Sequence, residues 1–261
     1  MTTPEKAALY RRALEMLNRS GVPYLVGGTY AFQYYAGIAR ETKDFDIFVR
    51  PRDTARVLDV LGQAGFRTEI AFSHWLAKAH HGDKFIDVIY SSGNGVAEVD
   101  DEWFAHAVDE AVLGVPVRLC PAEEMIWSKA FIMERERYDG ADVAHLLRHC
   151  SGLLNWERLV RRFGSHWRVL LAHVVLFGFI YPGERALVPS SLIKDLLNRV
   201  LSELDVPTRD SKVCQGTLLS RAQFLADVDD WGYEDARLSP RGALSEQQVA
   251  EWTAAIDKGQ H

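Results

Sequence analysis

At its most informative point the sequence reads Thr42-Lys43-Asp44-Phe45-Asp46-Ile47-Phe48-Val49. Polar and apolar side chains alternate here, which predicts a β-strand with Asp44 and Asp46 on one face and an apolar core on the other. Two like charges side by side in an apolar strand are costly unless a cation neutralises them. Carboxylate oxygens are the ligands that Mg²⁺ prefers, so the stretch predicts a strand that carries a magnesium site.

A glycine-rich turn precedes this strand. The apolar segment 22–26 predicts a short strand, Gly27-Gly28-Thr29 follows it at once, and 30–37 has the character of a helix. Glycines next to a helix N-terminus let backbone N–H groups bind a phosphate, and Thr29 adds a hydroxyl donor. A tight turn with no ligand is the commoner meaning of two glycines after a strand.

A third carboxylate lies in another apolar strand. Lys84-Phe85-Ile86-Asp87-Val88-Ile89-Tyr90 is strongly strand-like, and Asp87 is its only acidic residue. A salt-bridged or edge-exposed aspartate would explain it equally well taken alone. If this strand joins the sheet that holds Asp44 and Asp46, the three carboxylates have the composition of a site for two divalent ions.

Together these motifs resemble the DNA polymerase beta-like nucleotidyltransferase superfamily. The resemblance rests on Gly27-Gly28-Thr29, Asp44-Phe45-Asp46 and Ile86-Asp87-Val88, and it covers roughly residues 20–150. The spacing is most similar to the branch of bacterial toxin nucleotidyltransferases and their uncharacterised relatives. The implied fold class is α+β: a small mixed twisted sheet flanked by helices, followed by an all-helical C-terminal domain.

The resemblance also implies roles for individual residues. Asp44 and Asp46 would ligate two Mg²⁺ ions, and Asp87 would ligate the one next to the nucleophile and help to activate it. The glycine turn with Thr29 would hold the triphosphate of a nucleotide such as ATP. The implied reaction is transfer of a nucleoside monophosphate (NMP) to an acceptor hydroxyl with release of pyrophosphate.

A later helical motif adds three further candidates. The toxin branch has a lysine followed by an arginine and Asp-x-x-Asp, similar to Lys129, Arg135 or Arg137, and Asp139 with Asp142. Lys129 would bind the β- and γ-phosphates, and the two aspartates would belong to the nucleotide-binding set. An ordinary solvated helix face with an Arg135–Asp139 ion pair is the alternative for the aspartates.

The organisation of the chain changes near residue 120. Residues 1–120 read as the catalytic domain, with one strand-like region at 67–78 and a helix at 103–112, and 121–261 as a helical domain that completes the nucleotide and acceptor site. The candidate helices of the second part are 122–136, 139–150, 155–163, 167–180, 190–204, 217–228 and 245–258.

Composition limits the compartment and the partners. Three widely spaced cysteines in a 261-residue chain predict reduced thiols and a cytoplasmic protein. The first residues lack the apolar core of a signal peptide, and the run from Val169 to Ile180 is too short to span a bilayer, so no membrane association is expected. The net charge of −6 argues against a surface that binds nucleic acid all over.

Several other residues have two interpretations each. Arg158, Arg161, Arg162, His166 and Arg168 form the most basic segment, which either contacts a phosphate backbone such as that of tRNA or is a solvated face. Trp75 either stacks on a base or packs in the core, and Arg40 either contacts phosphate or lies on the surface. His145 and His149 have the spacing of a zinc face but no further ligand.

The acceptor stays open at this point. RNA, with a toxin-like effect and an antitoxin as a partner protein, is one expectation. A small hydroxyl compound, as in aminoglycoside-modifying relatives, is the second. A nucleotide-binding module without catalysis is the third, although all three carboxylates are present.

Overall fold

The computed structural model describes residues 4–42, 44–206 and 211–256. The chain divides into two compact units, of which the first comprises Met1–Pro121 with Gly242–His261 and the second comprises Ala122–Arg241. The boundary between the two units after Pro121 lies next to the change from mixed to helical sequence that was predicted near residue 120. The C-terminal segment, in contrast, returns to the first unit and is not part of the helical region to which its sequence assigned it.

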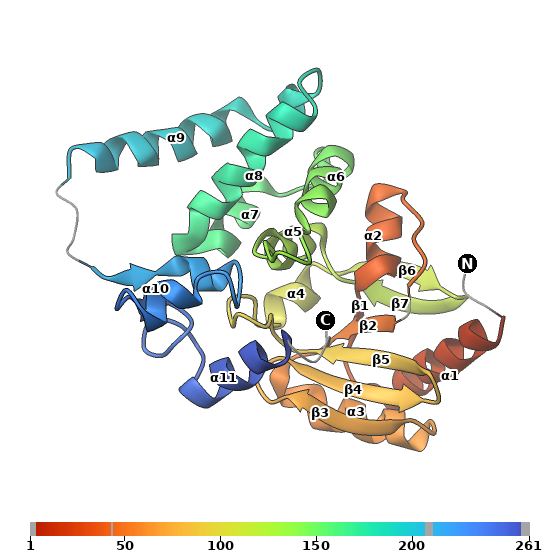
Figure 1. Ribbon diagram of the computed structural model, residues 1–261. Helices are drawn as coiled ribbons and strands as arrows, with labels where there is room; N and C mark the ends of the chain where they lie inside the picture. The colour runs from red at the N-terminus through yellow and green to blue at the C-terminus, as the bar shows by residue number, and fades with distance from the viewer. Residues whose placement is uncertain (1–3, 43, 207–210, 257–261) are drawn as a thin grey trace. The chain divides into compact units, whose positions relative to one another are not determined.

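A mixed sheet forms the centre of the first unit (Figure 1). Its strand order is β3-β4-β5-β2-β1-β7-β6. β2 pairs in parallel with β5 and β1 in parallel with β7, and the other pairs are antiparallel. The strands are β1 (Leu25–Val26), β2 (Asp44–Phe48), β3 (Arg67–Phe72), β4 (Leu76–His81), β5 (Lys84–Ile89), β6 (Val108–Val112) and β7 (Val115–Leu119).

Apolar side chains of the central strands meet the helices of this unit. Along β2 the side chains alternate in burial, with Phe45 and Ile47 at 1% and 0% exposure. Tyr10 packs on Phe45 with 4.9 Å between ring centroids, and full burial of such a side chain contributes about 1.5–3 kcal/mol. The helices of the unit are α1 (Pro4–Ser20), α2 (Gly28–Ala36), α3 (Thr54–Gln63), α4 (Asp101–Ala105) and α11 (Glu246–Ala254).

Two elements of the first unit differ from the prediction. The helix predicted at 103–112 is wrong beyond Ala105, because β6 forms a hairpin with β7 through Leu113 and Gly114, whose φ angles are +53° and +78°. Positive φ at both turn positions matches the twist of a two-residue hairpin. The single strand expected at 67–78 is two strands, β3 and β4, separated by a turn at residues 73–75.

The second unit is mainly helical, as the sequence predicts. The helix predicted at 217–228 is wrong before Leu225, where a 3₁₀ turn at Gln215–Leu218 precedes the shorter helix α10 (Leu225–Asp229). The pairing of β8 (Val213–Cys214) with β9 (Glu234–Asp235) adds a small parallel sheet. The helix predicted at 122–136 ends at Ala130, because Met133 and Tyr138 close a short hairpin. The helices are α5 (Ala122–Ala130), α6 (Gly140–Cys150), α7 (Trp156–Phe163), α8 (Trp167–Ile180), α9 (Ser190–Leu204) and α10 (Leu225–Asp229).

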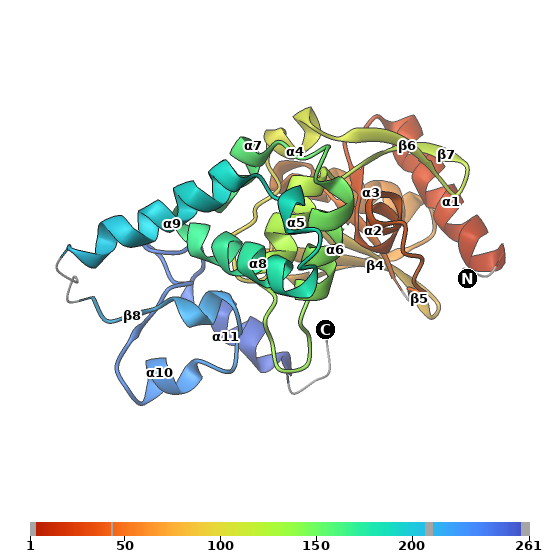
Figure 2. The same cartoon turned by 90° about the horizontal axis from the view of Figure 1, so that it is seen from above.

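One helical run of this unit is longer than its apolar segment suggested. α7, a short 3₁₀ turn and α8 follow one another directly, so Trp156–Ile180 is 25 residues long, with hydropathy 1.4 and 33% burial in its most apolar window. By length and composition this run is able to cross a membrane, and the core helix of a soluble protein meets the same criteria. α8 and α9 lie side by side in both views (Figures 1 and 2). Arg168 of α8 pairs with Glu203 of α9.

Candidate functional site

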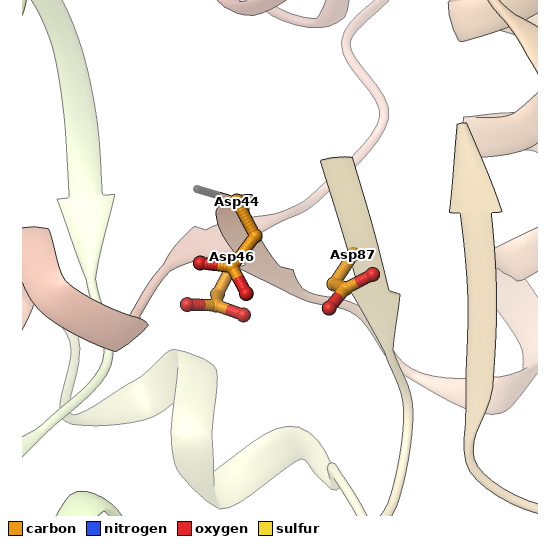
Figure 3. A group of neighbouring side chains, drawn as sticks. All are labelled: Asp44, Asp46 and Asp87. Atoms are coloured by element: carbon orange, nitrogen blue, oxygen red, sulfur yellow. The ribbon is translucent and has the colours of Figure 1, made fainter. Parts of the chain in front are cut away.

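Three carboxylates converge on the central sheet. β2 carries Asp44 and Asp46, and β5 beside it carries Asp87, which is paired in register with Asp46. One ligand oxygen from each lies within 4.8 Å of the others (Figure 3). Asp87 is buried, and Asp44 and Asp46 are half-buried. The sheet thus brings together Asp46 and Asp87, which are 41 positions apart in the sequence. The sequence predicted a strand for each of them but not that the two strands are neighbours. We call these three residues the aspartate site.

The electrostatics of the aspartate site are dominated by Asp87. Burial raises the pKa of Asp87, the neighbouring charge of Asp44 raises it further, and Lys78 opposes both. Lys78 Nζ on β4 donates to Asp87 Oδ1 at 2.9 Å. At the other end of the site, the Thr42 hydroxyl donates to Asp44 Oδ1. The carboxylates are therefore held in place, and their mutual repulsion favours a bound cation.

The donor set fits a divalent metal ion. All three ligands are hard carboxylate oxygens, which suit Mg²⁺ better than they suit a thiolate- or imidazole-preferring metal. Oxygens on opposite sides of one Mg²⁺ lie about 4 Å apart, which is near the spread of the aspartate site. Within the described residues, these three aspartates are the only group of potential ligands of that size. His145 and His149 form no such group.

The two glycines of the turn lie so close to β2 that neither position has room for a larger side chain. Gly28 has a φ of +51°, and a Cβ placed on it would lie 1.7 Å from Asp46 Oδ2. A Cβ on Gly27 would lie 2.3 Å from the Phe48 ring, and the Gly27 N–H donates to the Asp46 carbonyl at 3.1 Å. The N-terminus of α2 therefore packs directly on Asp46. Close approach to the aspartate site explains the glycines without reference to a nucleotide.

Lys129, Asp139 and Asp142 come together in the second unit. Lys129 Nζ lies 2.8 Å from Asp139 Oδ2 and 2.9 Å from Asp142 Oδ2, and all three side chains are largely buried. Arg137 donates to both oxygens of Asp139 at 3.0 Å, in place of the pair with Arg135 that the helical spacing suggested. Burial alone would raise the pKa of Asp139, but Lys129 and Arg137 outweigh it and lower this pKa. We call these four residues the Lys129 cluster.

The predicted basic face does not form as an open surface. Arg158 is 2% exposed and lies 2.9 Å from Glu123, and it also contacts Glu124, which is fully buried. Arg162 pairs with Glu124 at 2.8 Å. Arg158 is therefore not part of a solvated face, and it is not accessible for contact with a phosphate backbone. Both interpretations of the segment are wrong for this residue. Its role is to neutralise two glutamates inside the helical unit.

This network predicts a large stability effect. Replacing Arg158 with methionine leaves the buried charge of Glu124 with one arginine instead of two, and the destabilisation should reach about 3 kcal/mol. Urea unfolding measures the loss. Arg161→Met, at an exposed position on the same helix, is the control and should change stability by no more than about 0.5 kcal/mol. Equal effects of the two substitutions would contradict a structural role for Arg158.

Trp75 packs against the core, whereas Arg40 lies on the surface. Trp75 stacks on Phe72 at 5.6 Å between centroids and, like Trp252 of α11, packs against a cluster of Phe72, Leu76 and Ala255. The core interpretation of Trp75 is thus confirmed. Arg40 is exposed, in agreement with its surface interpretation, and its guanidinium lies 4.5 Å from the centroid of the Phe32 ring on α2.

Lys78 belongs to the surroundings of the aspartate site, although the sequence did not suggest it. In the register of β4 and β5 it lies directly opposite Asp87. The available signal was a hairpin signature, His81-Gly82-Asp83, between two strand-like segments. Counting outward from that turn pairs residue 78 with residue 87, but only if 67–78 is divided into two strands.

A comparison with known protein families identifies a class of enzyme. A family model described as uncharacterised nucleotidyltransferase matches residues 5–173 of the chain. A search of curated proteins found no match.

Several solved structures resemble the chain distantly. The antibiotic-resistance factor ANT(2'')-Ia is 20% identical over 66% of this chain and 98% of its own, with a TM-score of 0.48. The lincosamide antibiotic adenylyltransferase LnuA is 16% identical over 56% of this chain and 98% of its own, with a TM-score of 0.39. JHP933 from Helicobacter pylori is 15% identical over 75% of this chain and 93% of its own, with a TM-score of 0.38. At these TM-scores the likeness carries no argument about substrates.

Proposed function

The chain belongs to the family of uncharacterised nucleotidyltransferases, and we propose that it transfers an NMP from a nucleoside triphosphate to an acceptor hydroxyl in a Mg²⁺-dependent reaction. The observation that supports the metal dependence is the convergence of Asp44, Asp46 and Asp87, whose oxygens lie within 4.8 Å of one another. Three carboxylates are a poor environment for a triphosphate unless cations intervene. The aspartate site therefore needs a metal ion before it can receive this substrate.

The proposed reaction is an in-line displacement at the α-phosphorus. The acceptor oxygen forms a bond to the α-phosphorus, the bond from that phosphorus to the bridging oxygen breaks, and pyrophosphate leaves. Bound Mg²⁺ supplies charge neutralisation and alignment of the phosphates. Asp44, Asp46 and Asp87 would hold it, with Thr42 fixing the Asp44 carboxylate. Asp87 would orient the acceptor hydroxyl and take its proton on Oδ2, the oxygen not bonded to Lys78.

We propose nucleotide-binding roles for the glycine turn and for the Lys129 cluster. Gly27, Gly28 and Thr29 begin α2, whose N-terminal N–H groups suit a phosphate. In the Lys129 cluster, the ammonium is bound by two carboxylates, so Lys129 would have to exchange at least one of them for a phosphate oxygen. Asp139 and Asp142 would then serve to hold Lys129 extended in the absence of nucleotide.

RNA as the acceptor has less support from this chain than its basic segment suggested. The basic segment that favoured it places Arg158 in the core and pairs Arg162 with Glu124 and Arg168 with Glu203. The net charge of −6 also argues against binding of an RNA phosphate backbone. We therefore favour a small hydroxyl compound over RNA as the acceptor. The proposed function does not require an antitoxin partner.

A labelling experiment tests both the reaction and the acceptor. Each NTP, labelled at the α-phosphate, is incubated with the protein, Mg²⁺ and either total RNA or a fraction of small metabolites. We expect label in a small-molecule product, none in RNA, and none anywhere after metal removal with EDTA. Label in RNA would overturn the choice of acceptor. The absence of transfer with every NTP and fraction, or transfer that survives EDTA, would overturn the proposed function.

A further inference from the structure

A lysine faces the third carboxylate of the aspartate site across one strand pair. Lys78 on β4 and Asp87 on β5 are directly opposite in an antiparallel register, where side chains on one face lie close together. The Lys78 ammonium donates to Asp87 Oδ1 at 2.9 Å, and the two side chains are only 19% and 13% exposed. A pair this sheltered is much less screened by solvent than a surface salt bridge.

The lysine is held from a second side by an aromatic ring. The Lys78 ammonium lies 4.5 Å from the centroid of the Phe85 ring, within the range of a cation–π contact. The backbone of Phe85 is held in place, because its carbonyl accepts a hydrogen bond from Tyr10 at 3.1 Å and its strand pairs with β2. The ring and the carboxylate together define one position for the ammonium and, through it, one orientation for Asp87.

We propose that Lys78 is a positioning residue: it occupies Oδ1 of Asp87 so that this carboxylate presents a single oxygen to the metal and the acceptor, and its charge balances the aspartate site before metal binds. This inference rests on the proposed function, because it assigns a task to Asp87 in metal-dependent transfer. Lys78 touches neither metal nor substrate in this role. It acts only through Asp87.

Two effects of opposite sign follow from the removal of Lys78. Without the ammonium, a divalent cation meets less repulsion and more uncompensated negative charge, so it should bind more tightly. The Asp87 carboxylate is then also free to rotate and to bind the metal through both oxygens. In that orientation it no longer aligns the acceptor, so transfer becomes slower. A residue needed only for folding would weaken metal binding and transfer together.

The test compares three variants of the full chain. Lys78→Met keeps the stem over the Phe85 ring and removes the charge, while Lys78→Arg keeps charge and donors. Lys84→Met is the matched control, since Lys84 lies on β5 and pairs only with the exposed Glu5 and Asp83 among the described residues. The measurements are the calorimetric affinity for Mn²⁺ alone, the Tm with and without Mn²⁺, and the rate of NMP transfer.

For Lys78→Met we expect Mn²⁺ to bind on the order of tenfold more tightly. The Tm gain on adding Mn²⁺ should exceed that of wild type, and transfer should be about tenfold slower. Lys78→Arg should restore most of both properties, and Lys84→Met should match wild type. If Lys78→Met fails to fold even with Mn²⁺, Lys78→Gln provides the same comparison, since it also lacks the charge.

Failure of the inference is distinguishable from failure of the proposed function. Wild type that binds Mn²⁺ and transfers NMP, beside a Lys78→Met variant with unchanged or weaker Mn²⁺ affinity, would overturn the role of Lys78 alone. An unchanged transfer rate in that variant would do the same. Wild type that neither binds Mn²⁺ nor transfers NMP would overturn the proposed function and this inference together.

Discussion

Replacing Asp46 with asparagine is expected to reduce NMP transfer by about a thousandfold or more, because it removes a charged metal ligand at the point where the triphosphate must be neutralised. The fold should survive. Asparagine has the same shape, and the loss of one of three adjacent negative charges relieves repulsion in the metal-free protein. Steady-state rates at saturating Mg²⁺, together with the Tm, separate these two effects.

The control for this substitution is another strand aspartate. Asp109→Asn lies on β6 of the same sheet, where the Asp109 side chain is 94% exposed, and it should leave both the rate and the Tm unchanged. A rate loss in Asp46→Asn that is accompanied by unfolding would show that Asp46 is structural. Transfer by Asp46→Asn within tenfold of wild type would remove Asp46 from the metal site.

The second large effect is expected for Gly28→Ala. The added Cβ would lie 1.7 Å from Asp46 Oδ2, so the carboxylate must move away from its position. A shift of this size in a metal ligand should slow transfer by at least about a hundredfold. The φ of +51° adds about 1 kcal/mol of backbone strain, which a denaturation curve will show as a modest loss of stability.

The opposite end of the same helix offers a matched control. Gly37 ends α2 with a φ of +67°, and a Cβ there would meet no atom within 4 Å. Gly37→Ala should therefore lose a similar amount of stability but keep its transfer rate. If the two alanine variants lose transfer equally, the effect comes from strain in α2. If neither loses it, the contact between Gly28 and Asp46 does not matter for the reaction.

The sequence predicted most of the aspartate site because its signals were local. Alternation alone puts Asp44 and Asp46 on one face, and the same face of a neighbouring strand is where Asp87 has to lie. The two glycines were also predictable as a turn. Their actual reason, the packing of α2 on Asp46 and Phe48, needed the spatial pairing of β1 and β2.

What the sequence did not predict depended on contacts between distant residues. β6 has no strong strand signal, and its hairpin pairing with β7 overrides the helical character of the residues before it. Arg158 looked solvated on its own helix, but two glutamates of α5 neutralise it in the core. The return of α11 to β3 depends on packing of Trp252 near Trp75, which no local pattern records.

NMP transfer differs from other reactions of a nucleotide in the fate of each phosphate of the triphosphate. The protein is incubated with Mg²⁺, acceptor and NTP labelled at either the α- or the γ-phosphate, beside the Asp46→Asn variant. We predict that the α-label appears in the product while the γ-label leaves as pyrophosphate, and that both events disappear in the variant. Transfer of the γ-label to the acceptor, or α-label transfer that persists in Asp46→Asn, would contradict NMP transfer at the aspartate site.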